Sequence, residues 1–122
     1  MAVRLDAAGV AKTKTLDEAL LLLQRVNGLV EAYAVALRGN QPSAQLVQNI
    51  RRTLPTLAAN LTSQFGLIAE QVTAVNLTVS RGASEQVRLR QMREGVSLIR
   101  QSLEIAFAQV RDRHAVREDS AP

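Results

Sequence analysis

Apolar residues recur every three or four positions over three long stretches of the chain, which is the period of an amphipathic α-helix. The first stretch opens with Thr15 and Glu18, whose spacing can form a capping box at the start of a helix, and it is followed by Gly39-Asn40, which can end one. We therefore predict a helix between these signals. Its apolar seam consists of Leu16, Ala19, Leu23, Val26, Val30, Tyr33 and Leu37.

The second stretch extends from Ser43 to Ser80, and its apolar phase continues without interruption across Pro55. A proline inside a helix removes one backbone donor and clashes with the preceding turn. We therefore predict a long second helix that is kinked or split at Pro55, with the continuous phase favouring a kink. Its seam consists of Leu46, Ile50, Leu54, Leu57, Leu61, Phe65, Ile68, Val72, Val75 and Val79.

The third stretch follows Ser84, which can cap the first turn of a helix, while the charge of Glu85 suits the positive end of the helix dipole. The apolar positions of this stretch keep a heptad spacing, so we predict a third long helix. Its seam consists of Leu89, Met92, Val96, Ile99, Leu103, Ala106 and Val110.

These elements predict an all-α fold, an antiparallel bundle of three long helices that becomes a four-helix bundle if Pro55 splits the second. We expect one domain over residues 15–113, a flexible basic amino-terminal tail over 1–14 and a flexible carboxy-terminal tail over 114–122. The second helix is longer than either neighbour. Its ends therefore need cover, either from a fourth helix within the chain or from a partner chain.

The residue types present exclude several classes of chemistry. The chain has no cysteine and a single histidine, His114, so it has no disulfide, no thiol nucleophile and too few ligands for a typical zinc site. Motifs for a di-iron bundle, a phosphate-binding loop or a serine nucleophile are absent from the sequence. We expect no catalytic residue, no cofactor and no metal, and we expect His114 to be a surface histidine that nothing positions.

Several features favour binding to another protein. Residues 41–80 carry only Arg51, Arg52 and Glu70 as charges, and more aliphatic side chains are present than one seam can use. A wide core stripe or a helix flanked on two sides by its own neighbours explains the same pattern equally well. We predict a non-enzymatic module that self-associates or binds another helical protein. Its candidate interface residues are Leu22, Leu29, Leu67, Leu77, Leu98 and Ile105.

The alternative function rests on charge. Fifteen basic against eleven acidic side chains give a net charge of +4, and arginine is concentrated on the third helix. Nucleic acid or another anionic surface is thus a possible partner, although acidic residues share the same span. The candidate contacts are Arg88, Arg90, Arg93 and Arg100.

The amino-terminal segment interrupts any apolar run with Arg4 and Asp6, so the sequence predicts neither a signal peptide nor a membrane-spanning segment. We therefore expect a cytoplasmic protein. Arginine greatly outnumbers lysine, which is consistent with a GC-rich coding sequence and with a bacterial source.

Overall fold

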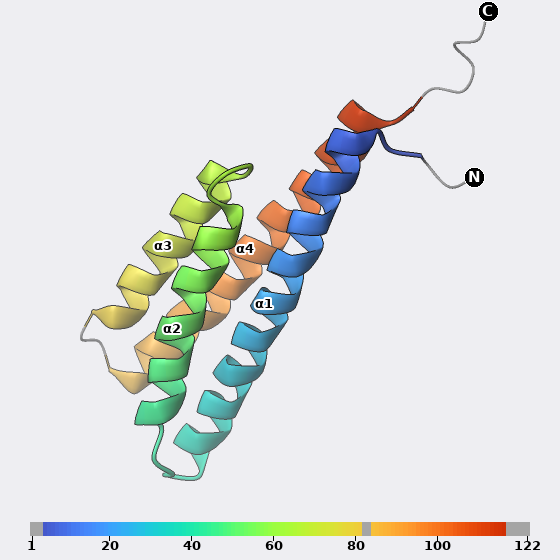
Figure 1. Ribbon diagram of the computed structural model, residues 1–122. Coiled ribbons are helices and arrows are strands. Elements are labelled where there is room, and N and C mark those ends of the chain that lie inside the picture. The colour runs from blue at the N-terminus through green and yellow to red at the C-terminus, as the bar shows by residue number, and fades with distance from the viewer. Residues whose placement is uncertain (1–3, 82–83, 117–122) are drawn as a thin grey trace, which may run out of the picture.

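The computed structural model describes residues 4–81 and 84–116, and over these residues the protein is all-helical. Four helices follow one another along the chain (Figure 1). They are α1 (Ala7–Arg38), α2 (Ala44–Leu61), α3 (Gly66–Ser80) and α4 (Glu85–His114).

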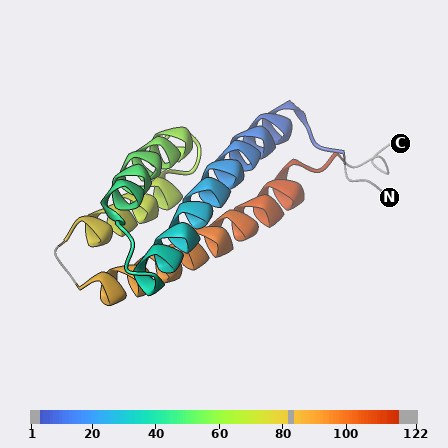
Figure 2. The same ribbon diagram turned by 90° about the horizontal axis from the view of Figure 1, so that it is seen from below.

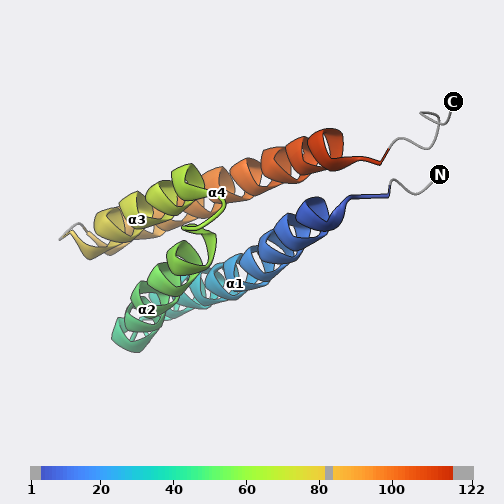
Figure 3. The ribbon, with the colours of Figure 1, turned by 45° about the horizontal axis from the view of Figure 1, so that its top comes forward.

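Each helix packs against its neighbours in sequence, and α4 returns to pack against α1, so the four helices form a closed ring. The lengths are unequal, since α1 and α4 have 32 and 30 residues while α2 and α3 have 18 and 15. The long pair therefore extends well beyond the short pair at one end (Figures 1 and 2). Figure 3 shows the turn between α2 and α3 crossing from the side of α1 to the side of α4.

The helix α1 begins at Ala7 rather than at Thr15, so much of the expected tail over 1–14 is helical. The cap is Asp6, whose carboxylate accepts a hydrogen bond of 2.7 Å from the Gly9 amide. Thr15 lies in the helix interior, where its hydroxyl donates to the carbonyl of Ala11. The carboxyl end agrees with the prediction, because Gly39 ends the helix and Asn40 takes a positive φ of 50°.

The predicted second helix is two helices, but the break is not at Pro55. Pro55 lies inside α2, on its exposed side, where the Arg51 carbonyl that loses its donor can bind water. The chain reverses instead at Thr62–Phe65, between the end of α2 and Gly66. A single straight helix would leave part of its seam uncovered. After this reversal α2 and α3 pack against each other, and in addition α2 packs against α1 and α3 against α4.

The helix α4 begins as predicted, with the Ser84 hydroxyl accepting a hydrogen bond of 3.3 Å from the Val87 amide. The predicted flexible tail over 114–122 differs from the structure at residues 114–116, which are ordered by backbone contacts. Ala115 forms an antiparallel bridge with Leu5, and the Val116 amide donates to the Arg4 carbonyl at 2.7 Å. The remainder of that expected tail, 117–122, lies outside the described residues.

The core is built from the predicted seams, and most of their members are buried. It contains Tyr33 as its largest side chain and is otherwise aliphatic apart from Met92. This agrees with a chain that has one tyrosine, two phenylalanines and no tryptophan. No polar or charged residue among those described is buried. Shape-filling by branched aliphatic groups therefore holds the four helices together.

One described helix, α1, has the length and apolar composition that crossing a membrane requires. Its apolar seam packs into the bundle. The core helix of a soluble bundle has the same length and composition, so this property does not discriminate between the two environments.

Gly95 of α4 lies directly against Val75 of α3. A β-carbon placed there would lie 2.6 Å and 2.9 Å from the two γ-carbons of Val75. Valine is stiff at χ1, so it cannot easily turn away. A β-carbon at Gly28, in the interior of α1, would meet nothing within 4 Å.

We expect Gly95→Ala to destabilise the protein by about 1 to 2 kcal/mol, because the overlap with Val75 outweighs the better helix propensity of alanine. Gly28→Ala is the control and should stabilise it by up to about 1 kcal/mol. Urea unfolding measures both changes. The double variant Gly95→Ala/Val75→Ala should cost less than the sum of its single changes, and equal stabilisation by both glycine substitutions would contradict the contact.

Candidate functional site

Large aliphatic side chains are exposed on the outer sides of α3 and α4. The exposed fractions are 83% for Leu67, 55% for Leu77, 51% for Leu98 and 59% for Ile105. All four belong to the predicted interface set. Such side chains are unremarkable when scattered but indicate a binding surface when they lie together.

Contacts between α3 and α4 show which of these side chains are neighbours. The Ser102 hydroxyl on α4 donates to the Gln71 side-chain carbonyl on α3 at 2.7 Å. Leu67 lies one turn before Gln71, and Leu98 and Ile105 lie one turn to either side of Ser102. We call Leu67, Gln71, Leu98, Ser102 and Ile105 the α3–α4 face.

The α3–α4 face itself contains no charged residue. Glu70 is the single charge within α3, and Glu94 lies one turn before Leu98 on α4. Leu77 lies further round α3, beside Thr73 and Ala74 in a shallow groove that runs along α3 to Thr62 of the α2–α3 turn. The face is thus an aliphatic surface with a hydrogen-bonded polar pair at its centre and acids at its margins.

The two remaining predicted interface residues, Leu22 and Leu29 on α1, are half-buried and pack against the core. They account for part of the surplus of aliphatic residues as a widened core stripe, which was the alternative explanation. The structure therefore separates the six predicted residues into four exposed ones and two that contribute to the fold.

The four arginines of the alternative function do not share one surface. Arg93 forms a bidentate pair with Glu31 of α1 at 3.2 and 3.3 Å, and Arg88 is half-buried with its Nε atom enclosed. Arg90 and Arg100 are exposed. Because Arg88 and Arg90 are two positions apart, they point about 200° from each other around the helix.

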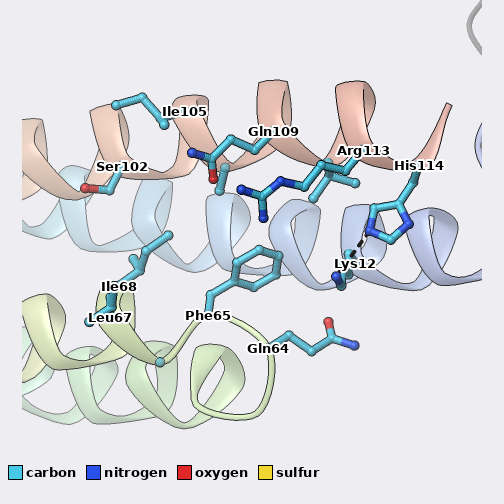
Figure 4. A pocket seen from close by; sticks show the side chains of 13 residues that line it. Lys12, Gln64, Phe65, Leu67, Ile68, Ser102, Ile105, Gln109, Arg113 and His114 are labelled. Atoms are coloured by element: carbon cyan, nitrogen blue, oxygen red, sulfur yellow. Dashed lines mark hydrogen bonds between the residues drawn. The ribbon is translucent and has the colours of Figure 1, made fainter.

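A cleft of about 400 Å³ opens where the α2–α3 turn meets the extended parts of α1 and α4. The Phe65 ring and Ile68 line one side of it, and Gln109 and Arg113 reach in from α4 (Figure 4). Lys12 of α1 closes one end. The other lining residues are Gln64, Gly66, Leu67, Ser102, Ile105, Ala106, Val110 and His114.

The charged groups that line this cleft are all positive. Its lining includes the cations Lys12 and Arg113 but no carboxylate. Among the described residues, neither cation has a carboxylate oxygen within 4 Å. The first turn of α3, which begins at Gly66, has no side-chain cap and no acidic residue. Its free amides add to the positive potential.

His114 is positioned, contrary to expectation, by two partners from the amino-terminal part of the chain. Its Nδ1 lies 3.1 Å from the Asp6 carboxylate, and its Nε2 lies 3.2 Å from the Lys12 ammonium. An ammonium group can only donate, so Nε2 accepts and the proton on the neutral ring is at Nδ1. These three residues form a terminal clasp across the ends of α1 and α4.

The pKa of Asp6 is lowered from its ordinary value, chiefly because its carboxylate accepts the hydrogen bond from the Gly9 amide. His114 and then Lys12 also favour the charged carboxylate, while partial desolvation opposes them. The carboxylate thus both caps α1 and orients the imidazole.

The sequence predicts neither the cleft nor the clasp. Its periodicity predicts Phe65 as a seam residue, and the expected tail includes Lys12. The available signal was Asp6 followed by Ala7 and Ala8, a capping residue before strong helix formers. A helix that starts at this cap is long enough for its first turn to lie beside the carboxyl end of α4.

Comparisons of the chain with protein-family models, with curated proteins and with solved structures found no match. In the described part of the chain, no group of three or more His, Cys, Asp or Glu side chains is placed to hold a metal ion.

The pKa of Asp6 predicts an acid-dependent contribution to stability. Because the pKa is lower in the folded state, the contribution is complete above the unfolded value of about 3.9 and is lost as the pH falls through the folded value. We expect Asp6→Asn to be less stable than wild type at pH 5, with the difference shrinking below about pH 4. Denaturant unfolding at a series of pH values between 2 and 5 measures it.

Asp17→Asn is the control, since Asp17 is an exposed acid of α1 that makes no hydrogen bond or ion pair with a described residue. Its difference from wild type should stay small over that range. A constant difference for Asp6→Asn at all pH values would show that the carboxylate charge contributes nothing.

Proposed function

We propose that this chain is a non-enzymatic helical assembly module that associates with a second copy of itself through the α3–α4 face. The observation that carries the proposal is the exposure of Leu67, Leu98 and Ile105 on two adjacent helices. Removing a side chain of this kind from water is worth about 1.5 to 3 kcal/mol when its burial is complete. Covering all three side chains therefore contributes several kcal/mol to the free energy of association, on the order of 5 kcal/mol or more.

A second copy fits this surface because the five residues of the face are uncharged and the acids Glu70 and Glu94 lie at its margins. A twofold axis near Ser102 would place Leu98 of one copy opposite Ile105 of the other, since both residues lie one turn from it. The Gln71 and Ser102 side chains would meet their counterparts at the centre. Buried polar groups at one position of a helical interface fix its register.

The unequal helix lengths give less support to association than the sequence suggested. The reversal at Thr62–Phe65 supplies the fourth helix from within the chain, so most of the long seam is covered without a partner. The proposal therefore rests on the exposed side chains. The charge-driven alternative gains less support, because Arg88 is half-buried and points away from Arg90, and Arg93 is paired with Glu31.

We expect Leu98→Glu to convert the assembled protein into a monomer while leaving its helix content unchanged. A glutamate at a desolvated contact costs several kcal/mol, whereas the same side chain at a solvent-facing position costs almost nothing. Leu21→Glu is the matched control, because Leu21 is 66% exposed on α1, away from the face. It should keep the wild-type mass. Light scattering coupled to size exclusion, with circular dichroism, measures both.

Leu67→Glu provides a second test, since Leu67 is 83% exposed and its replacement cannot disturb the core. It should also weaken association. A wild-type mass that remains monomeric at high micromolar concentration would exclude self-association. The α3–α4 face would then have to bind a different helical protein.

A further inference from the structure

We propose that the cleft beside the α2–α3 turn is a binding site for an amphipathic carboxylate, an aliphatic chain that ends in one anionic group. This site adjoins the α3–α4 face but has its own charged end, because Lys12, Phe65 and Arg113 are not part of that face. Three residues of the face, Leu67, Ser102 and Ile105, also line the cleft.

The aliphatic part of such a ligand matches the walls of the cleft. Phe65 and Ile68 from the α2–α3 region lie on one side of it (Figure 4), and Ala106 and Val110 of α4 also line it. A volume of about 400 Å³ falls within the range of small-molecule sites, which is roughly 300 to 1,000 Å³. Filling the cleft with methylene groups would remove these side chains from water.

The anionic part matches the charged end of the cleft. Lys12 and Arg113 come from different helices and line the same space, which contains no carboxylate. The Lys12 ammonium has three donors and uses one of them on His114, and among the described residues the other two have no partner and can bind a ligand oxygen. Arg113 presents the planar donor pair that suits a carboxylate. The uncapped first turn of α3 reinforces the preference for negative charge.

The numbers of charged and apolar side chains that line the cleft indicate which class of ligand it binds. Two cations among mostly apolar and amide side chains suit one anionic group, not a polyanion such as nucleic acid, which requires an extended surface of one sign. A neutral hydrocarbon would offer neither Lys12 nor Arg113 an anionic partner. A cationic amphiphile would be repelled.

Titration of the full-length protein with dodecanoate, kept below its micelle-forming concentration, tests the proposal. We expect saturable binding of one dodecanoate per chain by calorimetry, and at least about tenfold weaker binding of dodecanol, which lacks the charge. Lys12→Gln/Arg113→Gln should weaken dodecanoate binding by at least about tenfold. The control Lys14→Gln/Arg111→Gln removes two exposed cations from the same helices outside the cleft and should change it less than about twofold.

Equal binding of dodecanoate and dodecanol to wild type would overturn the proposal even if the cleft variant failed to fold. So would equal effects of the two double variants. Vesicles of phosphatidylglycerol provide another comparison, and binding to vesicles without binding to free dodecanoate would indicate a membrane surface instead of the cleft. Leu98→Glu should bind dodecanoate as wild type does, since Leu98 does not line the cleft. Failure of self-association therefore leaves this test intact.

Discussion

The architecture depends on the reversal of the chain at Thr62–Phe65. The helices α1 and α4 each present an apolar stripe much longer than either α2 or α3, and two helices alone cannot enclose a core. Doubling back lets one continuous apolar phase supply two short helices, each covering a different long helix. The closed ring, the exposed sides of α3 and α4, and the cleft at the turn all follow from this single reversal.

The sequence determined the seams well and the break poorly, for identifiable physical reasons. Buried positions such as Leu23, Ile50 and Leu103 repeat with the helical period, and that period reports burial directly. Leu61, Phe65 and Ile68 keep the same spacing across the turn, so periodicity could not reveal it. Pro55 gave the strongest local signal but lies where the solvent can satisfy the unpaired carbonyl.

The candidate sites likewise divide into one that the sequence predicts and one that it does not. Leu98 and Ile105 were identified from one helix, because a second stripe seven residues apart is a local property. The cleft combines Lys12, Phe65 and Arg113, which meet only once the helix lengths and the turn are known. Sites assembled from three distant segments depend on tertiary packing, and hydrophobic spacing within one element contains no information about it.

The terminal clasp has a consequence for how the chain folds. Asp6 and His114 are 108 positions apart in sequence, so their contact closes nearly the entire chain into a ring. Closing a longer loop costs more chain entropy, although the cost grows only logarithmically with length. Contacts between consecutive helices close much shorter loops and can form first. The α1–α4 contact at the clasp is thus expected to form late on the folding pathway and, by the same reasoning, to be among the first to open.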